Sequence, residues 1–390
     1  MKAIINTKLI MEDGIIFDGA LTYENGRIVE VGEKDSVTIP EGAEMIDAKG
    51  LYTAPGFVDL HNHGYEKAFF FQDPMGCCEH FLKHGQTTVL PTLYCDLTAQ
   101  QYIDAAALLK ETSKKGAGKI IEGLYMEGPY MDGTGSNQKY IIWNDLIKKE
   151  DYEELVQKLK GFAKVWAIAP ERENMEEFVA YVHEEDPNAV FAMGHSAARA
   201  AQARKLKKYG IKLQTHFGDS GKAEGLAQGV IGGGCDEYCL YDPDIYAELI
   251  CDQLGIHQDE AMIKMLIRTK GVERVCLITD SSCAMGDFKP NEEEGIAYGP
   301  DLNYDYEGHL AGSHVTMDNA VRNVMRHSGY GLCHAVRMAS YNPARVLGLD
   351  EEIGSLEAGK KANLIIMDDA VNIQKVILEG ETMVENGELV

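Results

Sequence analysis

The chain has 390 residues, of which 45% are hydrophobic, so it is long enough to bury a large core and to form a large domain with a smaller one. Its formal net charge of −25 repels the phosphates of nucleic acids and the headgroups of anionic lipids. The charge therefore argues against nucleic acid or a membrane surface as the main partner and favours a small molecule.

Residues 1–53 predict the first part of a small β domain. Apolar segments alternate with turn signals, and Asn25-Gly26 is typical of a tight hairpin between two strands. The N-terminal stretch has no signal-peptide core, and no later apolar run is long enough to span a bilayer. The nine cysteines are an odd number scattered along the chain, which suits free thiols, so we expect a cytoplasmic protein.

Residues 54–348 alternate short apolar strands with helix-like stretches, a pattern typical of βα units around a parallel sheet. The eight strand candidates are GFVDLHNH, TTVLPTLYC, KIIEGLYME, KVWAIAPE, AVFAMGHS, IKLQTHF, AELICDQ and RVCLITDSS. Eight such units are the number in a (β/α)8 barrel, and an open doubly wound sheet is the alternative. Residues 349–390 return to short strands divided by glycines and charged turns, which predicts the second part of the β domain.

Metal-competent side chains fall at the carboxyl ends of these predicted strands. His61 and His63 lie on one face of the first strand, about 7 Å apart along it, because side chains alternate between the two faces. The side chains at the ends of other strands are Glu127, His195, His216 and Asp280. In a barrel the strand ends converge on one mouth, where active sites are built, so this pattern favours the barrel over the open sheet.

Imidazole and carboxylate groups are ligands of zinc and of ferrous iron. Four histidines with two carboxylates are more than one tetrahedral ion needs, so the sequence predicts two divalent ions, or one ion and a vacant site. A lone HxH pair is more often an ordinary polar feature of a strand end, and the shared position of all six residues is what favours a metal site. Because bound metals lower the pKa of water, hydrolysis is the implied reaction, with Asp280 as the group that moves protons.

The chain resembles the amidohydrolase superfamily and, within it, the N-acetylglucosamine-6-phosphate deacetylase family. The resemblance covers nearly the whole chain and is carried by ten motifs in the family's order. They are APGFVDLHNHG, LPTL, GLYMEGPY, APE, GHSAA, THF, ITDSSCAMG, LAGSHVTMDNAVRNV, ASYNPARVLGL and GSLEAGKKANLIIMD. It implies an α/β fold, a (β/α)8 barrel with a small β-sandwich domain formed from both chain ends, and a homodimer.

The resemblance also implies roles for the six strand-end residues. By the family's pattern, His61, His63 and Asp280 hold one metal, and Asp280 is the catalytic acid and base. Glu127 with the histidines of GHSAA and THF holds the other metal, and Glu127 bridges the two. Cys95 stands where some related deacylases have a metal ligand, and we interpret it instead as a small buried apolar residue.

The segments that contact substrate in the family match less well. The family carries a histidine after the third strand, where this chain has Ser136 and Asn137. After the sixth strand, Asp219 and Ser220 occupy the family's Asn-Ala positions, and the arginine that grips the sugar phosphate is missing. Lys222 is the nearest substitute, but a lysine lacks the two-pronged geometry that suits phosphate.

Two other family positions are kept. His257 matches a histidine that reaches the substrate of the neighbouring subunit, and Leu310, Ala311 and Gly312 match a loop that lines the sugar. The leading hypothesis is therefore a metal-dependent amidohydrolase that deacetylates N-acetylglucosamine 6-phosphate to glucosamine 6-phosphate and acetate. One alternative is a deacylase of another N-acyl amine, such as an N-acyl-D-amino acid or an unphosphorylated N-acetyl amino sugar. Another is a barrel that binds a ligand without catalysis.

Overall fold

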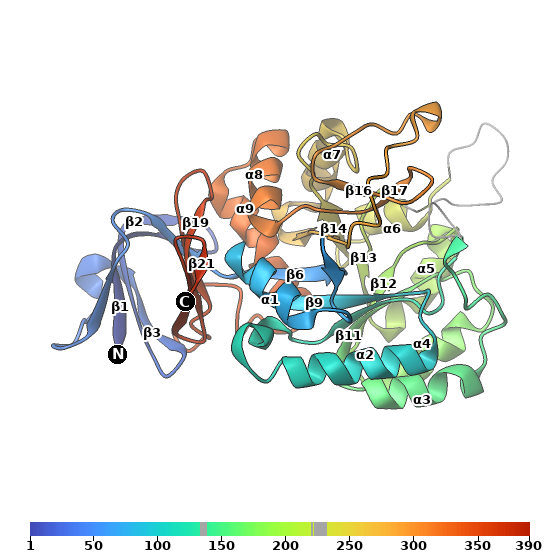
Figure 1. Ribbon diagram of the computed structural model, residues 1–390, viewed down its shortest axis with the longest axis horizontal. Coiled ribbons are helices and arrows are strands. Elements are labelled where there is room, and N and C mark those ends of the chain that lie inside the picture. The colour runs from blue at the N-terminus through green and yellow to red at the C-terminus, as the bar shows by residue number, and fades with distance from the viewer. Residues whose placement is uncertain (133–138, 220, 222–231) are drawn as a thin grey trace.

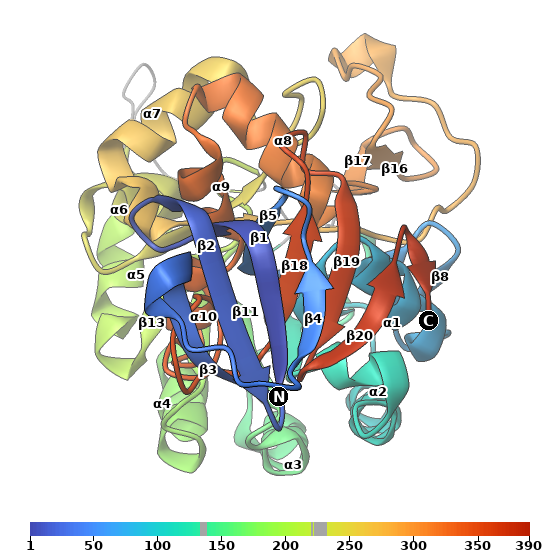
Figure 2. The same cartoon turned by 90° about the vertical axis from the view of Figure 1, so that its left-hand side faces the viewer.

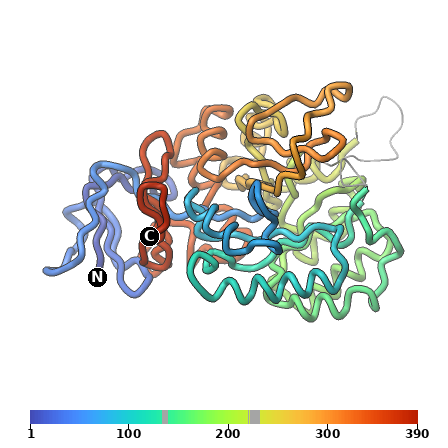
Figure 3. The backbone as a smooth tube through the Cα atoms, viewed as in Figure 1, coloured from blue at the N-terminus to red at the C-terminus, as the bar shows by residue number. Residues whose placement is uncertain are grey.

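The computed structural model describes residues 1–132, 139–219, 221 and 232–390. They form a barrel surrounded by helices and, beside it, a small β domain that holds both ends of the chain (Figures 1 and 3). Within these residues, no helix is both long and apolar enough to cross a membrane.

The β domain is one nine-stranded sheet assembled from both chain ends, and Figure 2 shows it in front of the barrel. Its strands are β1 (Lys2–Ile10), β2 (Ile15–Glu24), β3 (Arg27–Glu33), β4 (Glu44–Asp47), β5 (Tyr52–Pro55), β18 (Leu364–Met367), β19 (Ile373–Leu378), β20 (Glu381–Glu385) and β21 (Glu388–Leu389). The two chain ends meet where β5 pairs antiparallel with β18. A three-ten helix, η1 (Lys34–Ser36), follows β3.

The predicted hairpin at Asn25-Gly26 is confirmed. These two residues connect β2 to β3, and Glu24 pairs directly with Arg27. Both turn residues have positive φ, 51° for Asn25 and 76° for Gly26, which is the conformation that a two-residue turn between twisted strands requires.

All eight predicted barrel strands are present, in one parallel sheet whose order follows the chain from β6 to β15. They are β6 (Phe57–Asn62), β9 (Gln86–Tyr94), β10 (Leu124–Glu127), β11 (Ala163–Ile168), β12 (Val190–Met193), β13 (Ile211–Gln214), β14 (Tyr246–Ile250) and β15 (Val275–Ile278). The third strand is shorter than predicted, because residues 116–120 form a three-ten helix, η2, whose Ile120 packs into the main core. The sheet is nearly closed, and the (β/α)8 prediction is confirmed.

Helices cover the outside of the barrel (Figure 1). They are α1 (Pro74–Lys83), α2 (Ala99–Thr112), α3 (Lys149–Leu159), α4 (Met175–Glu185), α5 (Ala200–Leu206), α6 (Cys235–Tyr241), α7 (Glu260–Lys270), α8 (Met317–Ser328), α9 (Leu332–Ala339) and α10 (Tyr341–Val346). Shorter elements are the hairpins β7 (Gly64–Tyr65) with β8 (Ala68–Phe69) and β16 (Leu302–Tyr304) with β17 (Leu310–Ser313), and the three-ten helices η4 (Lys207–Tyr209), η5 (Val272–Arg274) and η6 (Glu292–Glu294). Both hairpins bring side chains to the mouth of the barrel, as described below.

A buried carboxylate joins the first and last strands of the barrel. Asp59 in β6 accepts hydrogen bonds from the backbone N–H of Thr279 at 3.2 Å and from its hydroxyl at 2.7 Å. The side-chain amides of Asn62 and Gln86 donate to the same carboxylate, each at 2.9 Å. Four donors on one side chain therefore hold β6, β9 and the end of β15 together.

Asp59→Asn is expected to lower the free energy of unfolding by about 2 to 4 kcal/mol, because the amide has one acceptor oxygen and leaves buried donors unsatisfied. Urea unfolding followed by circular dichroism measures the change. Asp47→Asn is the matched control, since that carboxylate is exposed and bonds Asn6 and the Lys49 backbone. Equal stability losses in the two variants would show that Asp59 does not close the barrel.

Candidate metal centre

The six strand-end residues reach the mouth of the barrel from the ends of five strands. His61 lies in β6, His63 comes directly after that strand, and Glu127 is the last residue of β10, whereas the other three each come two residues after a strand. Those three are His195 after β12, His216 after β13 and Asp280 after β15, and all have positive φ, at 45°, 24° and 46°. Non-glycine residues adopt this conformation rarely, and it is concentrated at functional sites, where the surrounding structure enforces it.

Glu127 stands between two pairs of histidines. Its Oε1 lies 2.9 Å from Nε2 of His195 and 3.2 Å from Nε2 of His216. Its Oε2 lies 3.0 Å from Nε2 of His63 and 3.4 Å from Nε2 of His61. Each carboxylate oxygen therefore faces one histidine pair, so Glu127 could offer a ligand atom beside each pair.

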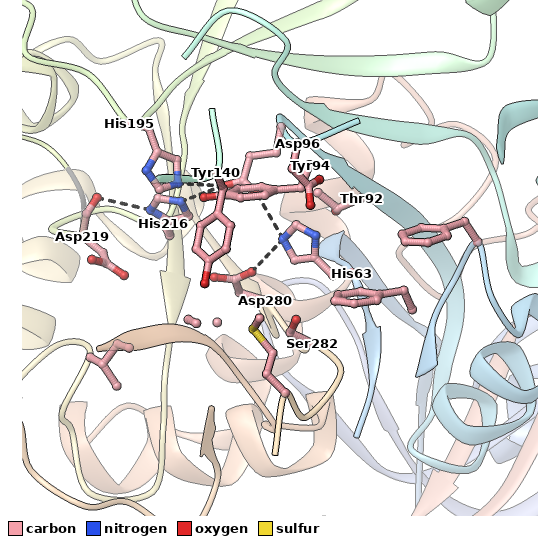
Figure 4. Close-up of a pocket in the computed structure, with 17 residues that line it drawn as sticks. His63, Thr92, Tyr94, Asp96, Tyr140, His195, His216, Asp219, Asp280 and Ser282 are labelled. Atoms are coloured by element: carbon pink, nitrogen blue, oxygen red, sulfur yellow. Dashed lines mark hydrogen bonds and ion pairs between the residues drawn. The ribbon is translucent and has the colours of Figure 1, made fainter. Parts of the chain in front are cut away.

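Asp280 faces the pair formed by His61 and His63. Its Oδ1 lies 3.3 Å from Nε2 of His63 and 3.5 Å from Nε2 of His61, and Figure 4 shows it below His63. The backbone N–H of Asp280 donates to the carbonyl of His61 at 2.9 Å, so the two strand ends are fixed to each other. The structure thus brings together all six residues that the sequence predicts to form the site.

The charges of the site perturb its titratable groups strongly. Burial alone would lower the pKa of His61, but the charges of Glu127 and Asp280 raise it well above its ordinary value. Burial opposes ionisation of Glu127, yet the charge of His61 and the hydrogen bonds of His195 and His216 hold its pKa well below the usual range. Positive charge is therefore strongly stabilised among these carboxylates.

Two buried atoms at the centre of the site indicate a metal ion. His61 Nε2 and Glu127 Oε2 have no hydrogen-bond partner within the described part of the chain, although their ion-pair distances are short. A buried polar atom without a partner is costly, and a coordinated cation would satisfy both atoms. The ligand atoms of His61, His63 and Glu127 lie within 4.8 Å of one another, as do those of Glu127, His195 and His216, so each set could hold an ion.

The metal-free protein is expected to lose stability as pH rises from about 6.5 to about 9. Burial alone would lower the pKa of His216, but the hydrogen bond to Glu127 and the charge of Asp219 raise it to about 9. Because the folded pKa exceeds the unfolded one, this contribution is complete below pH 6.5 and is lost as pH passes 9; it is on the order of 3 kcal/mol. Thermal unfolding with a chelator measures it, and His216→Gln should flatten the decline. A decline of equal slope in both proteins would contradict the assignment.

A pocket opens directly onto these residues. Leu310, Ala311, Gly312 and Asp219, which the sequence predicts to contact substrate, all line it. His257 lies behind them, with Nδ1 3.3 Å from Asp219 Oδ2 and Nε2 3.3 Å from the Gly312 carbonyl oxygen. The predicted residues Ser136, Asn137 and Ser220, and Lys222 with them, lie outside the described residues, so their substrate roles stay predictions.

Sequence reasoning missed the aromatic walls of the pocket. The rings of Phe69 and Phe71 are stacked with centroids 5.4 Å apart, and both line the pocket. Tyr94 and Tyr140 also line it, and Figure 4 shows their rings beside the histidines. Tyr94 is the last residue of β9 and could have been noted as a strand-end residue, whereas Phe69, at the end of the two-residue strand β8, and Phe71 and Tyr140, outside the strands and helices, follow no such pattern. Cys95, the residue after Tyr94, is fully buried in a hydrophobic cluster, which agrees with its interpretation as a small apolar residue.

The fold is a nearly closed (β/α)8 barrel, and histidines and carboxylates gather at the carboxyl ends of its strands. This combination is typical of barrel enzymes that use a bound metal for hydrolysis. Comparison of the sequence with protein families agrees, because residues 52–383 match the amidohydrolase family. The chain belongs to this family, and it is therefore an enzyme that acts on an amide carbon–nitrogen bond rather than a barrel that only binds a ligand.

Named relatives are similar to this chain over nearly its full length. It is 27% identical to the N-acetylgalactosamine-6-phosphate deacetylase of Escherichia coli O157:H7, an alignment covering 96% of this chain and 97% of the relative. It is 26% identical to the N-acetylglucosamine-6-phosphate deacetylase of Haemophilus influenzae, covering 97% and 98%. The crystal structure of the N-acetylglucosamine-6-phosphate deacetylase of Pasteurella multocida matches with a TM-score of 0.84 at 25% identity, covering 98% and 99%.

Proposed function

We propose that this enzyme hydrolyses the acetamide of an N-acetylated amino sugar, with N-acetylglucosamine 6-phosphate as its leading substrate and glucosamine 6-phosphate and acetate as products. The observation that carries the proposal is Glu127 between its two histidine pairs, with Asp280 facing one of them at the pocket. The similarity to named sugar-phosphate deacetylases along the whole chain supports this substrate class.

We assign one metal position to His61, His63 and Asp280, and the other to Glu127, His195 and His216. Nitrogen and carboxylate donors suit zinc or ferrous iron, and we propose one or two of these ions per chain. When bound, such ions lower the pKa of water and polarise the carbonyl under attack. Glu127 holds the two histidine pairs at a fixed spacing and carries the negative charge that balances the ions.

Asp280 is the group that we assign to proton transfer. Burial opposes its ionisation, but the charge of His61 and the hydrogen bond to His63 keep the pKa of Asp280 below its ordinary value. Its carboxylate is therefore ionised at neutral pH and can accept the proton of the attacking water. The same carboxyl group then donates that proton to the nitrogen of the leaving amine, which restores the ionised state for the next turnover.

The pocket gives the substrate a place beside these groups. Leu310, Ala311 and Gly312 on β17 line the pocket, and so do Tyr94 and Tyr140. Apolar rings suit the carbon face of a sugar, and backbone groups suit its hydroxyls. This arrangement orients the acetamide without requiring a charge on the sugar.

Acetate release from N-acetylglucosamine 6-phosphate by the zinc- or iron-loaded enzyme tests the proposal directly. We expect activity that is lost with a chelator and restored by adding the metal back. N-acetylgalactosamine 6-phosphate should be included, because one relative is named for that substrate. A fully loaded enzyme that releases no acetate from any N-acetylated amino sugar would overturn the proposal.

A second candidate is the deacylation of a substrate without a phosphate. No lysine or arginine is among the described residues that line the pocket, whereas Asp96, Glu127, Asp219 and Asp280 are. Carboxylates repel a phosphate and tolerate a neutral or cationic group. Comparing N-acetylglucosamine, its 6-phosphate and N-acetyl-D-amino acids at matched concentrations separates the two candidates, since the first predicts the highest kcat/KM for the phosphate.

We also propose that the enzyme works in the cytoplasm as a homodimer. All nine cysteines are free, seven of them buried, which suits a reducing compartment. The resemblance to the deacetylase family is what supports the dimer. Light scattering of the purified chain measures its assembly state, and a monomer with full activity would reject the dimer as a requirement.

A further inference from the structure

A second acidic residue lies behind the metal centre, inside the barrel. Glu248 is in the middle of β14 and its side chain is fully buried. Its neighbours along the strand, Ala247 and Leu249, are also fully buried. A buried carboxylate is costly unless it is hydrogen-bonded, so its contacts indicate why the barrel holds one.

One oxygen of Glu248 contacts both histidine pairs. Oε2 lies 3.3 Å from Nδ1 of His61 and accepts the backbone N–H of His216 at 3.0 Å. The backbone carbonyl of Glu248 accepts the N–H of Phe217 at 2.9 Å, which fixes the same turn after β13 a second time. Glu248 therefore connects His61, a candidate ligand on β6, to the turn after β13 that carries the candidate ligand His216.

The contact with His61 determines which ring nitrogen is available for a metal. His61 Nε2 points to Glu127 and Asp280, and its Nδ1 points to Glu248. The ring of Tyr125 packs against His61 with centroids 4.4 Å apart. A carboxylate that accepts the Nδ1 proton leaves the Nε2 lone pair free toward the site and makes the imidazole a stronger ligand.

We infer that Glu248 is a positioning residue of the metal centre, acting through His61 and the His216 turn. The inference rests on the proposed function, because it takes His61 as a metal ligand. Partners of this kind typically change metal affinity by about 10- to 100-fold. We expect the larger loss of metal affinity at the position of His61 and His63, because Glu248 contacts the imidazole of His61 there. At the other position it contacts only the backbone of His216.

The test measures metal binding and does not depend on activity. Zinc content per chain is determined after equilibration in zinc buffers, and the visible absorption of the cobalt-substituted protein reports the ligand geometry. Glu248→Gln is expected to weaken one zinc site by about 10- to 100-fold and to change the cobalt spectrum. Asp252→Asn is the matched control, because Asp252 is also fully buried, follows the same strand and accepts the backbone N–H groups of Ile256 and His257. It should keep both the zinc affinity and the spectrum.

Wild-type zinc affinity and an unchanged cobalt spectrum in Glu248→Gln would overturn the inference. An equal loss in Asp252→Asn would also overturn it, because the effect would then follow from a buried carboxylate of any kind. Where Glu248→Gln does not fold, Glu248→Asp keeps the charge but draws it back from His61, and it should weaken zinc about 10-fold; unchanged affinity there would overturn the inference. Failure of the wild-type chain itself to bind metal would instead reject the proposed function.

Discussion

Asp280→Asn is expected to lower kcat for acetamide hydrolysis by about 10²- to 10⁴-fold, because the amide cannot accept the proton of water or return it to the leaving amine. Asp280 is 6% exposed at the pocket, and no described lysine or arginine lines that pocket. The histidines beside it are already engaged with Glu127. His61 and His63 are therefore poorly placed to take over the proton transfer.

Steady-state acetate release with metal-loaded protein measures this effect, together with the metal content of each preparation. The ion assigned to Glu127, His195 and His216 should remain, because Asp280 contacts the other histidine pair. Asp96→Asn is the comparison, since it removes a second carboxylate from the pocket wall but none of the carboxylate contacts to the histidine pairs described above, and its loss of kcat should be much smaller. Full activity in Asp280→Asn would reject Asp280 as the proton-transfer group.

Glu127→Ala is expected to weaken metal binding at both positions at once, by at least about 10²-fold each. The reason is geometric, since each oxygen of this carboxylate faces a different histidine pair at 2.9 to 3.4 Å. If this carboxylate is shared between the two positions, as its place between the histidine pairs predicts, removing it would take one ligand from each position and leave four histidines without the charge between them. A direct ligand should matter more than a supporting residue, whose loss typically costs 10- to 100-fold.

Metal titration followed by calorimetry separates a shared ligand from two independent sites. His195→Ala is the control, because His195 contacts only Oε1 of Glu127, and it should weaken one position while the other keeps its affinity. Glu127→Ala should weaken both. A Glu127→Ala protein that still binds one ion with wild-type affinity would show that Glu127 does not bridge.

The positions of the candidate ligands could be predicted from sequence because strand geometry is local. An apolar run that ends in His61 and His63 places two imidazoles on one side, since side chains alternate along a strand. The other four residues follow apolar runs in the same way, and parallel strands of a barrel expose their carboxyl ends at one mouth. The Asn25-Gly26 turn is likewise local, because two positive φ values suffice to define it.

The remaining features depend on contacts between distant parts of the chain, which no local pattern encodes. Whether Glu127 lies beside one histidine pair or between two is decided by the curvature and stagger of the closed sheet. Glu248 is 187 residues from His61 in sequence. The sequence shows a charged residue within an apolar strand there, but it does not show that His61 is the partner of that charge. A buried carboxylate is stable only where distant donors converge on it, and only the packed barrel shows where they do.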